Sequence, residues 1–255
     1  MLRSRIIPVL LLRGRSLVKT IKFRKFSYIG DPCNTVRIFN ELEVDEISIL
    51  DIEATIKKKD PNYNLIGDIA SEAFMPLSYG GGIDSLAKAK KIFSLGIEKV
   101  ILNTAALDNP NLISEIAKVY GSQAIVVSID VKNSFLTKKY NVFSRSGRKK
   151  KNVDLLTWAK RCEDLGAGEI MLNNISRDGT WNGYDLDLYN NVQESVKIPL
   201  IGIGGAKNID DVVGLIKKAG CSAAGVGSMV VFQRKDMGVL INVPKPEEIE
   251  LLLHS

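Results

Sequence analysis

Short runs of apolar residues alternate along the chain with longer segments whose apolar residues recur on one helical face. The runs 100–102 and 124–129 are almost continuously apolar, as buried parallel strands are. The segments 85–95 and 210–218 have apolar residues at helical spacing. Most apolar runs are followed by Gly, Asn or Asp and then by a helical pattern, which predicts strict alternation of strand and helix. Eight strands are expected, beginning near Arg5, Glu46, Met75, Lys99, Gln123, Gly168, Ile198 and Ser222.

Eight successive strand–helix units close into a barrel more readily than they form an open sheet. The pattern therefore predicts an α/β protein with the (β/α)8 TIM-barrel fold. The chain has 255 residues, of which 45% are hydrophobic and 25% are charged. That size is typical of one such barrel around one large core. We expect a single domain over residues 1–255.

The chain also repeats itself at half its length. The segment 76–83, PLSYGGGI, matches the segment 199–206, PLIGIGGA, at an offset of 123 residues. Glu46-Ile and Glu169-Ile, each before a predicted strand, have the same offset. A half-length repeat in an eight-unit barrel indicates two fused half-barrels, at roughly 1–120 and 121–255. Functional positions should then occur in pairs across the barrel mouth.

Glycine-rich turns follow the third and seventh predicted strands, and small or polar residues follow the fourth and eighth. Glycine lets backbone N–H groups approach a phosphate closely, and the start of a following helix favours an anion. The alternative is that these glycines only make tight turns. Their occurrence in pairs favours two phosphate sites and a long, doubly phosphorylated ligand. The predicted phosphate-binding residues are Gly81, Gly82, Asn103 and Thr104 in the first half and Gly204, Gly205, Gly227 and Ser228 in the second.

Three aspartates follow predicted strands. Asp51 follows the second strand, Asp130 the fifth and Asp178 the sixth. A carboxylate at the C-terminal end of a buried barrel strand points towards the substrate, and partial desolvation can tune it for proton transfer. Asp130 is the catalytic candidate, with Asp51, Asp178 and Lys19 as substrate-binding candidates. Asp also caps helices and makes turns, and Lys19 could either hold an anion or close with a flexible loop at 20–30.

The composition limits the remaining chemistry. The net charge of +6 suits anionic metabolites, an acidic partner or weak attraction to nucleic acid. The basic run from Arg145 to Lys151 has no interleaved aromatic residues, which favours a solvated or phosphate-attracting loop over nucleic-acid binding. The three cysteines lack metal-ligand spacing, and His254 is the only histidine. We expect no metal site and no cofactor, so acid–base chemistry falls to carboxylates, lysines or tyrosines.

The N-terminal segment only briefly resembles a secretion signal. Its apolar run 6–12 contains Pro8 and is followed by Arg13 rather than by a small-residue cleavage site. A buried first strand explains it better. No other run approaches the roughly 18 apolar residues that a membrane helix needs, so we expect a cytoplasmic protein without membrane association.

A set of motifs extends nearly colinearly with a known family from the N-terminus to about Phe232. The motifs are Arg5-Ile-Ile-Pro8, Lys19, Phe23, Gly30-Asp-Pro32, Leu50-Asp51-Ile52, Gly80-Gly-Gly-Ile83, Gly121-Ser-Gln123, Ile129-Asp130, Gly166-Ala-Gly-Glu169, Arg177-Asp-Gly-Thr180 and Gly204-Gly-Ala206. With them the chain resembles the cyclase subunit of imidazole glycerol phosphate synthase. The resemblance implies a barrel that receives ammonia from a glutaminase subunit docked on its N-terminal face. Ammonia would cross the barrel core and react with a bisphosphorylated aminoimidazole precursor, giving imidazole glycerol phosphate for histidine synthesis and a carboxamide ribonucleotide for purine synthesis.

The resemblance also implies a charged gate at the barrel floor. Arg5, Glu46, Lys99 and Glu169 stand at the starts of the first, second, fourth and sixth predicted strands and match the family's ring of alternating charges. Such a ring would satisfy its own charges while sealing an apolar bore. The alternative is ordinary surface charge, because strand starts are often polar.

Two departures from the family pattern qualify the implied activity. The family places an aspartate at the end of the first strand as the acid–base partner of Asp130, but this chain has Leu11 there. Loss of one of two acid–base groups commonly costs a factor of roughly 10² to 10⁴ in rate. The tail from Val231 to Pro246 also replaces the family's usual run into the last helix.

Both departures are similar to a paralogous branch found in surface-polysaccharide pathways. That similarity implies a barrel that relays ammonia to a third, ATP-dependent amidotransferase acting on a sugar. A second hypothesis is a histidine-pathway cyclase in which Asp130, Lys19 or bound water replaces the missing aspartate. A third is a scaffold that activates a glutaminase without chemistry of its own. A phosphosugar isomerase is less favoured, because it would need carboxylates on both the first and fifth strands.

Overall fold

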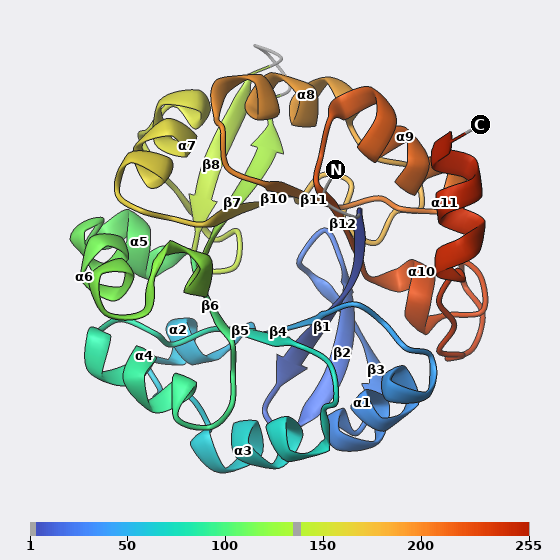
Figure 1. The fold of residues 1–255 in the computed structure, drawn as a ribbon, viewed down its shortest axis with the longest axis horizontal. Coiled ribbons are helices and arrows are strands. Elements are labelled where there is room, and N and C mark those ends of the chain that lie inside the picture. Colours follow the sequence, from blue (N-terminus) through green and yellow to red (C-terminus); the bar gives the residue numbers. More distant parts are fainter. Residues whose placement is uncertain (1–3, 135–138, 255) are drawn as a thin grey trace.

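Eight parallel strands close into a barrel in the computed structural model of the chain, which describes residues 4–134 and 139–254 (Figure 1). Each barrel strand pairs in parallel with the next, and the last pairs with the first through the register Arg5 to Ala223. The predicted (β/α)8 barrel is therefore confirmed. In chain order the barrel strands are β1 (Arg5–Arg13), β4 (Ile47–Asp51), β5 (Leu77–Gly80), β6 (Lys99–Leu102), β7 (Ile125–Asn133), β10 (Glu169–Asn174), β11 (Leu200–Ile203) and β12 (Ala223–Val226).

Helices surround the barrel, and their ends carry the expected capping residues. Asp31 caps α1 by accepting a hydrogen bond from the Asn34 N–H, and Ser85 caps α4 in the same way through the Lys88 N–H. Gly220 ends α9 in the left-handed conformation, at φ 70°. The helices are α1 (Pro32–Glu41), α2 (Ala54–Lys57), α3 (Tyr63–Glu72), α4 (Leu86–Phe93), α5 (Thr104–Asp108), α6 (Asn111–Tyr120), α7 (Leu155–Asp164), α8 (Leu186–Ser195), α9 (Ile209–Ala219), α10 (Ser228–Val231) and α11 (Pro246–His254), with a 3₁₀ turn η1 (Ser122–Ala124).

The apolar core has two layers, because successive strand residues point to opposite faces of the sheet. Alternate residues of β1 such as Leu10 and Leu12 pack outward in the large cluster beneath the helices. Ile7 and Val9 instead join a smaller cluster inside the barrel, together with residues such as Met171 of β10. The two clusters hold the strands rigidly between them and thereby fix the positions of the residues at both barrel ends.

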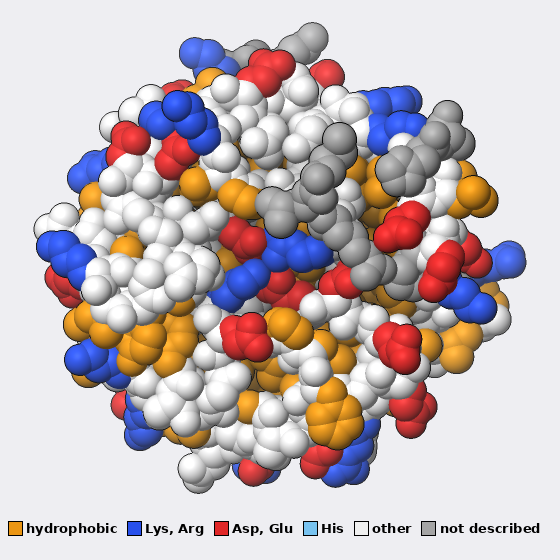
Figure 2. All heavy atoms as spheres, viewed as in Figure 1, with side chains coloured by type: hydrophobic (Ala, Val, Ile, Leu, Met, Phe, Trp, Pro, Cys, Tyr) orange, Lys and Arg blue, Asp and Glu red, His pale blue; other side chains and the backbone are white. Residues whose placement is uncertain are grey.

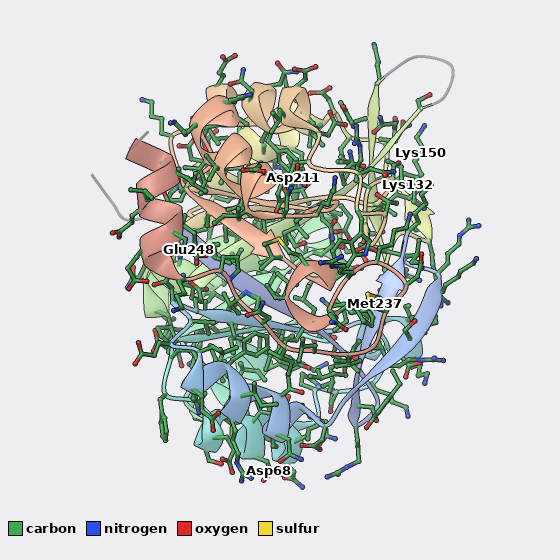
Figure 3. The ribbon with its side chains drawn as sticks, turned by 90° about the vertical axis from the view of Figure 1, so that its right-hand side faces the viewer. Asp68, Lys132, Lys150, Asp211, Met237 and Glu248 are labelled. Atoms are coloured by element: carbon green, nitrogen blue, oxygen red, sulfur yellow. The ribbon has the colours of Figure 1, made fainter. Side chains whose placement is uncertain are left out.

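The two ends of the barrel differ. Figure 2 shows one end, where acidic and basic side chains gather at the centre of the face. At the other end, seen at the right of Figure 3, two antiparallel hairpins extend the barrel sheet. β2 (Ser16–Ile21) pairs with β1 and with β3 (Lys25–Gly30), and β8 (Tyr140–Ser144) pairs with β7 and with β9 (Lys149–Lys150).

The sequence predictions agree with most of this architecture. The barrel strands begin at most two residues from their predicted starts. The segment 20–30, expected as a flexible loop, is instead mostly hairpin, because β3 gains a full antiparallel ladder with β2. The basic run at 145–151 is a turn that leads into β9. The division into half-barrels stays a prediction.

A few predictions fall at the limits of the described chain. Residues 1–3 of the N-terminal segment, considered above as a secretion signal, lie outside the described residues. The side chain of His254 does too. Among the described residues, no helix combines the length and the apolar character needed to cross a membrane.

Candidate active site

A cavity of about 630 Å³ opens at the C-terminal ends of the barrel strands. Its size is in the range of cavities that hold small metabolites. The structure brings every residue predicted to bind substrate or phosphate to this one cavity. Its lining includes Lys19, Asp51, Asp130 and Asp178, and also Gly81, Gly82, Asn103, Thr104, Gly204, Gly205, Gly227 and Ser228.

Asp130 lies on the inner face of β7 and is buried. Burial, followed by the nearby charge of Asp178, raises the pKa of Asp130 to about 7. The Asn103 side-chain amide donates a hydrogen bond of 3.3 Å to Asp130 Oδ2. A carboxyl with this pKa can accept or donate a proton near neutral pH, as the predicted catalytic role requires.

Lys19 lies on β2 and is buried beside the same cavity. Its ammonium donates a hydrogen bond to the Val9 carbonyl oxygen. Burial lowers the pKa of Lys19 to about 8, although Asp178 partly opposes the shift. The Lys19 Nζ is so close to Gly227 that a Cβ on that glycine would be 2.8 Å away. The lysine charge therefore adjoins one of the predicted phosphate loops.

Asp178 joins the loop after β10 to the β2–β3 hairpin. Its Oδ2 accepts hydrogen bonds from Thr20 Oγ1 at 2.8 Å and from the Phe23 N–H at 3.2 Å. Burial raises the pKa of Asp178, and the Thr20 and Phe23 hydrogen bonds partly offset that rise. The carboxylate thus holds the hairpin that carries Lys19, in addition to lining the cavity.

Asp51 at the end of β4 stabilises the turn that leads into the short helix α2. Its Oδ1 accepts hydrogen bonds of 2.9 Å from the N–H groups of Glu53 and Ala54. Burial raises the pKa of Asp51, and the two backbone hydrogen bonds oppose the rise. Turn formation, an alternative weighed for the aspartates from the sequence, therefore describes part of what Asp51 does, while Glu53 is the N-cap residue of α2.

The two glycine pairs occupy equivalent turns after β5 and β11. All four residues have positive φ, at 119° and 73° for Gly81 and Gly82 and at 110° and 105° for Gly204 and Gly205. A Cβ on Gly81 would be 2.4 Å from the Asp51 carbonyl oxygen. Glycine is required here by backbone conformation and by close packing. The glycines therefore make tight turns whether or not phosphate binds.

The predicted phosphate loop after β6 contacts the catalytic side of the cavity. Asn103 donates to the Ser128 carbonyl oxygen at 3.0 Å as well as to Asp130. Thr104 Oγ1 accepts a 2.9 Å hydrogen bond from the Arg145 N–H. The basic turn after β8 is therefore fastened to the mouth, and Arg145 also lines the cavity.

Leu11 occupies the end of β1 and lines the cavity near its floor. It is opposite Leu50 of β4 and Val18 of β2 in the sheet. The cavity wall is therefore apolar where the family pattern has an aspartate. Leu11 cannot exchange a proton, so the end of β1 provides no acid–base partner for Asp130.

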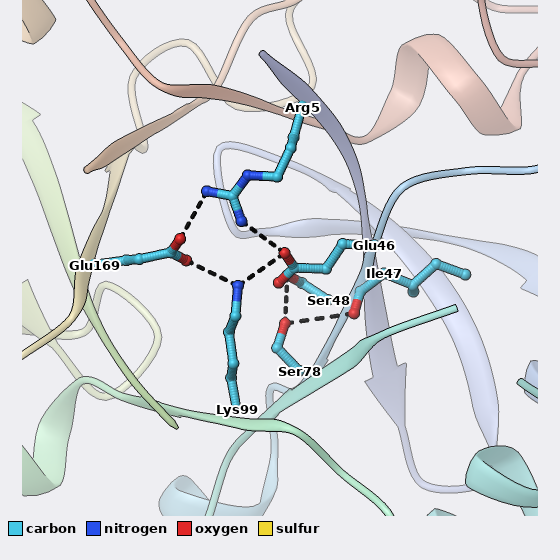
Figure 4. Close-up of polar contacts among 7 residues, drawn as sticks. All are labelled: Arg5, Glu46, Ile47, Ser48, Ser78, Lys99 and Glu169. Atoms are coloured by element: carbon cyan, nitrogen blue, oxygen red, sulfur yellow. Dashed lines mark hydrogen bonds and ion pairs between the residues drawn. The ribbon is translucent and has the colours of Figure 1, made fainter. Parts of the chain in front are cut away.

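The predicted gate residues form a closed ring at the opposite end of the barrel (Figure 4). Arg5 donates to Glu46 at 2.8 Å and to Glu169 at 2.7 Å, and Lys99 donates to the same two carboxylates at 2.9 and 3.2 Å. Burial lowers the pKa of Arg5, but Glu169 and Glu46 outweigh burial and raise it above its ordinary value. The four residues therefore neutralise one another, and their role as a gate stays a prediction.

Several polar groups inside the barrel were missed from the sequence. Ser48 and Ser78 hydrogen-bond to each other at 2.7 Å beside the ring, and both are buried. Asn173 is buried at the cavity, and its Oδ1 has no hydrogen-bond partner among the described residues. The alternation of side chains along a strand could have identified these residues. Counting in steps of two from the inward-facing Glu46 and Glu169 leads to Ser48 and to Asn173.

The chain is a (β/α)8 barrel with a cavity at the C-terminal ends of its strands that contains acidic and basic side chains. A family model described as "Histidine biosynthesis protein" matches residues 5–236. The chain belongs to the family of HisF-type cyclase subunits of imidazole glycerol phosphate synthase. The predicted resemblance is thereby confirmed.

Individual relatives cover nearly the whole chain. A Vibrio vulnificus protein provisionally named imidazole glycerol phosphate synthase subunit hisF3 is 48% identical, over 97% of this chain and 95% of its own. A Pseudomonas aeruginosa protein provisionally named subunit hisF2 is 47% identical, over 98% and 100%. The imidazole glycerol phosphate synthase subunit HisF of Lactococcus lactis subsp. cremoris is 40% identical, over 90% and 88%.

Proposed function

We propose that this barrel conducts ammonia from a glutaminase to a separate ATP-dependent amidotransferase that modifies a sugar for surface polysaccharide. The glutaminase would dock on the end that holds the charged ring. The observation that carries the proposal is Leu11, which places an apolar side chain where a cyclase would need its second acid–base group. The mouth would hold a phosphorylated ligand without closing an imidazole ring.

The interior suits neutral ammonia. Beyond the ring lie the buried Ser48–Ser78 pair and an apolar cluster that includes Ile7, Val126 and Met171. Ammonium would lose its hydration in such a bore at high cost, whereas ammonia would lose little and could use the serine hydroxyls. The ring is closed by four ion pairs in this structure, so passage requires it to open.

Sequence similarity also supports a branch distinct from the histidine-pathway subunits. The chain is 48% and 47% identical to the provisionally named Vibrio and Pseudomonas proteins. It is 40% identical to the Lactococcus HisF subunit. The HisF subunit of Sulfolobus acidocaldarius is 44% identical but over only 89% of this chain, so the grouping rests on coverage together with identity.

The alternative is a histidine-pathway cyclase, and one feature of the mouth favours it. Asp130 has a pKa of about 7 and Lys19 of about 8, so both can exchange protons near neutral pH. Lys19 could then act in place of the missing aspartate. Both proposals share the ligand site and differ in whether the barrel itself reacts.

A turnover assay separates the two. The purified barrel is mixed with the bisphosphorylated aminoimidazole precursor and excess ammonium salt, and formation of imidazole glycerol phosphate is followed. The natural chain is expected to bind the precursor without turnover. Leu11→Asp is expected to gain activity if the rest of the mouth is intact. The control is Leu11→Asn, because asparagine has the size of aspartate but cannot transfer a proton.

Either variant result is informative. Activity in Leu11→Asp alone, or none in any form while the precursor still binds, supports an ammonia conduit. Turnover of the natural chain at an ordinary enzymatic rate overturns the conduit proposal and establishes the cyclase.

A further inference from the structure

The rim of the cavity carries cations that no acidic side chain neutralises. Arg24 and Lys25 on the first hairpin, and Lys149 and Lys150 on the second, are exposed. Within residues 4–134 and 139–254, none of the four forms an ion pair, and none lines the cavity. These charges therefore face outward, beyond the reach of a small ligand held inside.

Exposed apolar side chains lie on the same rim. Phe26 and Tyr28 of β3 are 43% and 67% exposed. In the segment that follows α10, Met237 and Leu240 are also exposed, and Figure 3 shows Met237 towards the hairpin end. Aromatic residues, Met and Arg are the types enriched at protein interfaces. The rim combines them around one opening.

The outer edge of β3 offers a further means of attachment. Among the described strands, β3 pairs only with β2, so its other edge has unpaired backbone groups. Exposed edges of this kind accept an added strand from a partner, and Lys25 on the same strand discourages self-association.

The opposite end of the molecule carries exposed acidic side chains alongside lysines such as Lys118 and Lys218. Glu41, Glu43 and Glu98 are exposed near the starts of barrel strands, and Glu247 and Glu248 form the first turn of α11. In Figure 3 the labelled Lys132 and Lys150 lie at one end and Glu248 at the other.

We propose that this rim docks a protein with an acidic face, and that this protein is the enzyme that takes up the ammonia. That this partner is the ammonia-consuming enzyme rests on the proposed function. That the partner has an acidic face rests only on the basic side chains of the rim. Ammonia released at an open cavity would escape into water. A partner seated on the basic rim would cover the cavity and receive ammonia directly.

Charge and the cavity lining argue against two other occupants. A second copy of the chain docked rim to rim would bring two basic rims together and be repelled. A small anionic ligand would not contact Lys149 and Lys150, because they lie outside the cavity lining. Nucleic acid is the remaining polyanion, and the test distinguishes it.

The test uses the full chain and three fluorescent probes at several salt concentrations. The probes are a peptide of alternating Glu and Val, a peptide of the same length with Lys for Glu, and a short DNA duplex. The Glu peptide is expected to bind in a salt-sensitive way, and the Lys peptide to remain unbound. Lys149→Glu with Lys150→Glu, and separately Tyr28→Ser, should each weaken binding about tenfold.

A matched control keeps the net charge of the double variant. Lys118 and Lys218 are exposed in the last turns of α6 and α9, at the other end of the barrel. Lys118→Glu with Lys218→Glu should leave binding unchanged. Circular dichroism verifies that all variants are folded.

Each remaining outcome counts against the proposal. Equal loss in the control would show a non-specific charge effect, and absence of Glu-peptide binding would show that the rim is no docking surface. Tighter binding of DNA through the same residues would assign the rim to nucleic acid. Peptide binding needs no catalysis, so the two proposals can fail separately. If the natural chain proves to be a cyclase yet binds the Glu peptide, the proposed function is overturned and the acidic docking surface stands.

Discussion

Asp130 and Lys19 have pKa values displaced in opposite directions for the same reason. Burial penalises the charged form of each group, raising the pKa of Asp130 to about 7 and lowering that of Lys19 to about 8. Their ordinary values lie far from neutrality on either side. A site that holds both near neutral pH can exchange protons or bind anions, and it does so at a cost in stability.

Asp130→Asn should raise stability in a pH-dependent way. Between the unfolded pKa of about 3.9 and the folded pKa of about 7, the folded chain binds more protons, so its stability falls as pH rises. Asparagine removes that penalty. The advantage of the variant should grow by roughly 2 to 3 kcal/mol between about pH 5 and about pH 8. Urea unfolding at the two pH values measures it.

The control is Asp236→Asn, which removes an exposed carboxylate in the segment after α10. It should change stability equally at both pH values. Lys19 does not disturb the comparison, because both chains carry it and its pKa is shifted by burial and by Asp178 rather than by Asp130. An advantage of Asp130→Asn that stays constant with pH would mean that Asp130 is ionised normally.

At the scale of elements, the β2–β3 hairpin is fixed to the barrel mouth by the loop after β10. Asp178 accepts hydrogen bonds from Thr20 and Phe23, and Gly179 packs against the Thr20 backbone. Gly179 has φ 64°, and a Cβ there would be 2.2 Å from the Thr20 carbonyl oxygen. The position of Lys19 therefore depends on a glycine in another element.

Gly179→Ala should displace the hairpin and destabilise the chain. Gly14 has almost the same φ, 63°, but open space around it, so Gly14→Ala isolates the backbone cost of about 1 kcal/mol. Gly179→Ala should cost roughly 1 to 3 kcal/mol beyond that, because of the clash. Urea unfolding of both variants gives the difference. Equal losses would show that the loop and hairpin separate freely.

The sequence predicted the barrel and the cavity residues better than it predicted the hairpins. Continuous apolar runs such as 124–129 are typical of buried parallel strands, and the repeat drew attention to the glycine turns after β5 and β11, which both line the cavity. β3 was missed because four of its six residues are exposed. Its sequence therefore lacks the alternation of apolar and polar residues that marks a half-buried strand. The contact of Asp178 with Thr20 joins residues 158 apart and follows only from the closed fold.

At the scale of the whole molecule, the two ends of the barrel differ in whether their charged side chains form ion pairs. The ring residues Arg5, Glu46, Lys99 and Glu169 are mutually neutralised. Rim residues such as Lys149 and Lys150 form no ion pair within the described chain. A neutral ring can seal a bore yet open by exchanging partners, whereas a charged rim attracts an oppositely charged surface.

The ring should also contribute to stability, and Lys99→Met tests this. Lys99 is 16% exposed and bridges Glu46, which is only 4% exposed, to Glu169. Methionine retains the apolar stem but leaves two buried carboxylates with one cation. Removing one member of a buried charge cluster leaves an uncompensated charge, so a loss of roughly 2 to 4 kcal/mol is expected at neutral pH.

Lys160→Met is the matched comparison, because Lys160 also bridges two carboxylates, Glu163 and Asp164, but is 47% exposed on α7. Its loss should cost less than about 1 kcal/mol, since water screens exposed pairs. Chemical unfolding of both variants gives the difference. A Lys99→Met loss no larger than that of Lys160→Met would mean that water already solvates the ring and that the barrel floor is open rather than sealed.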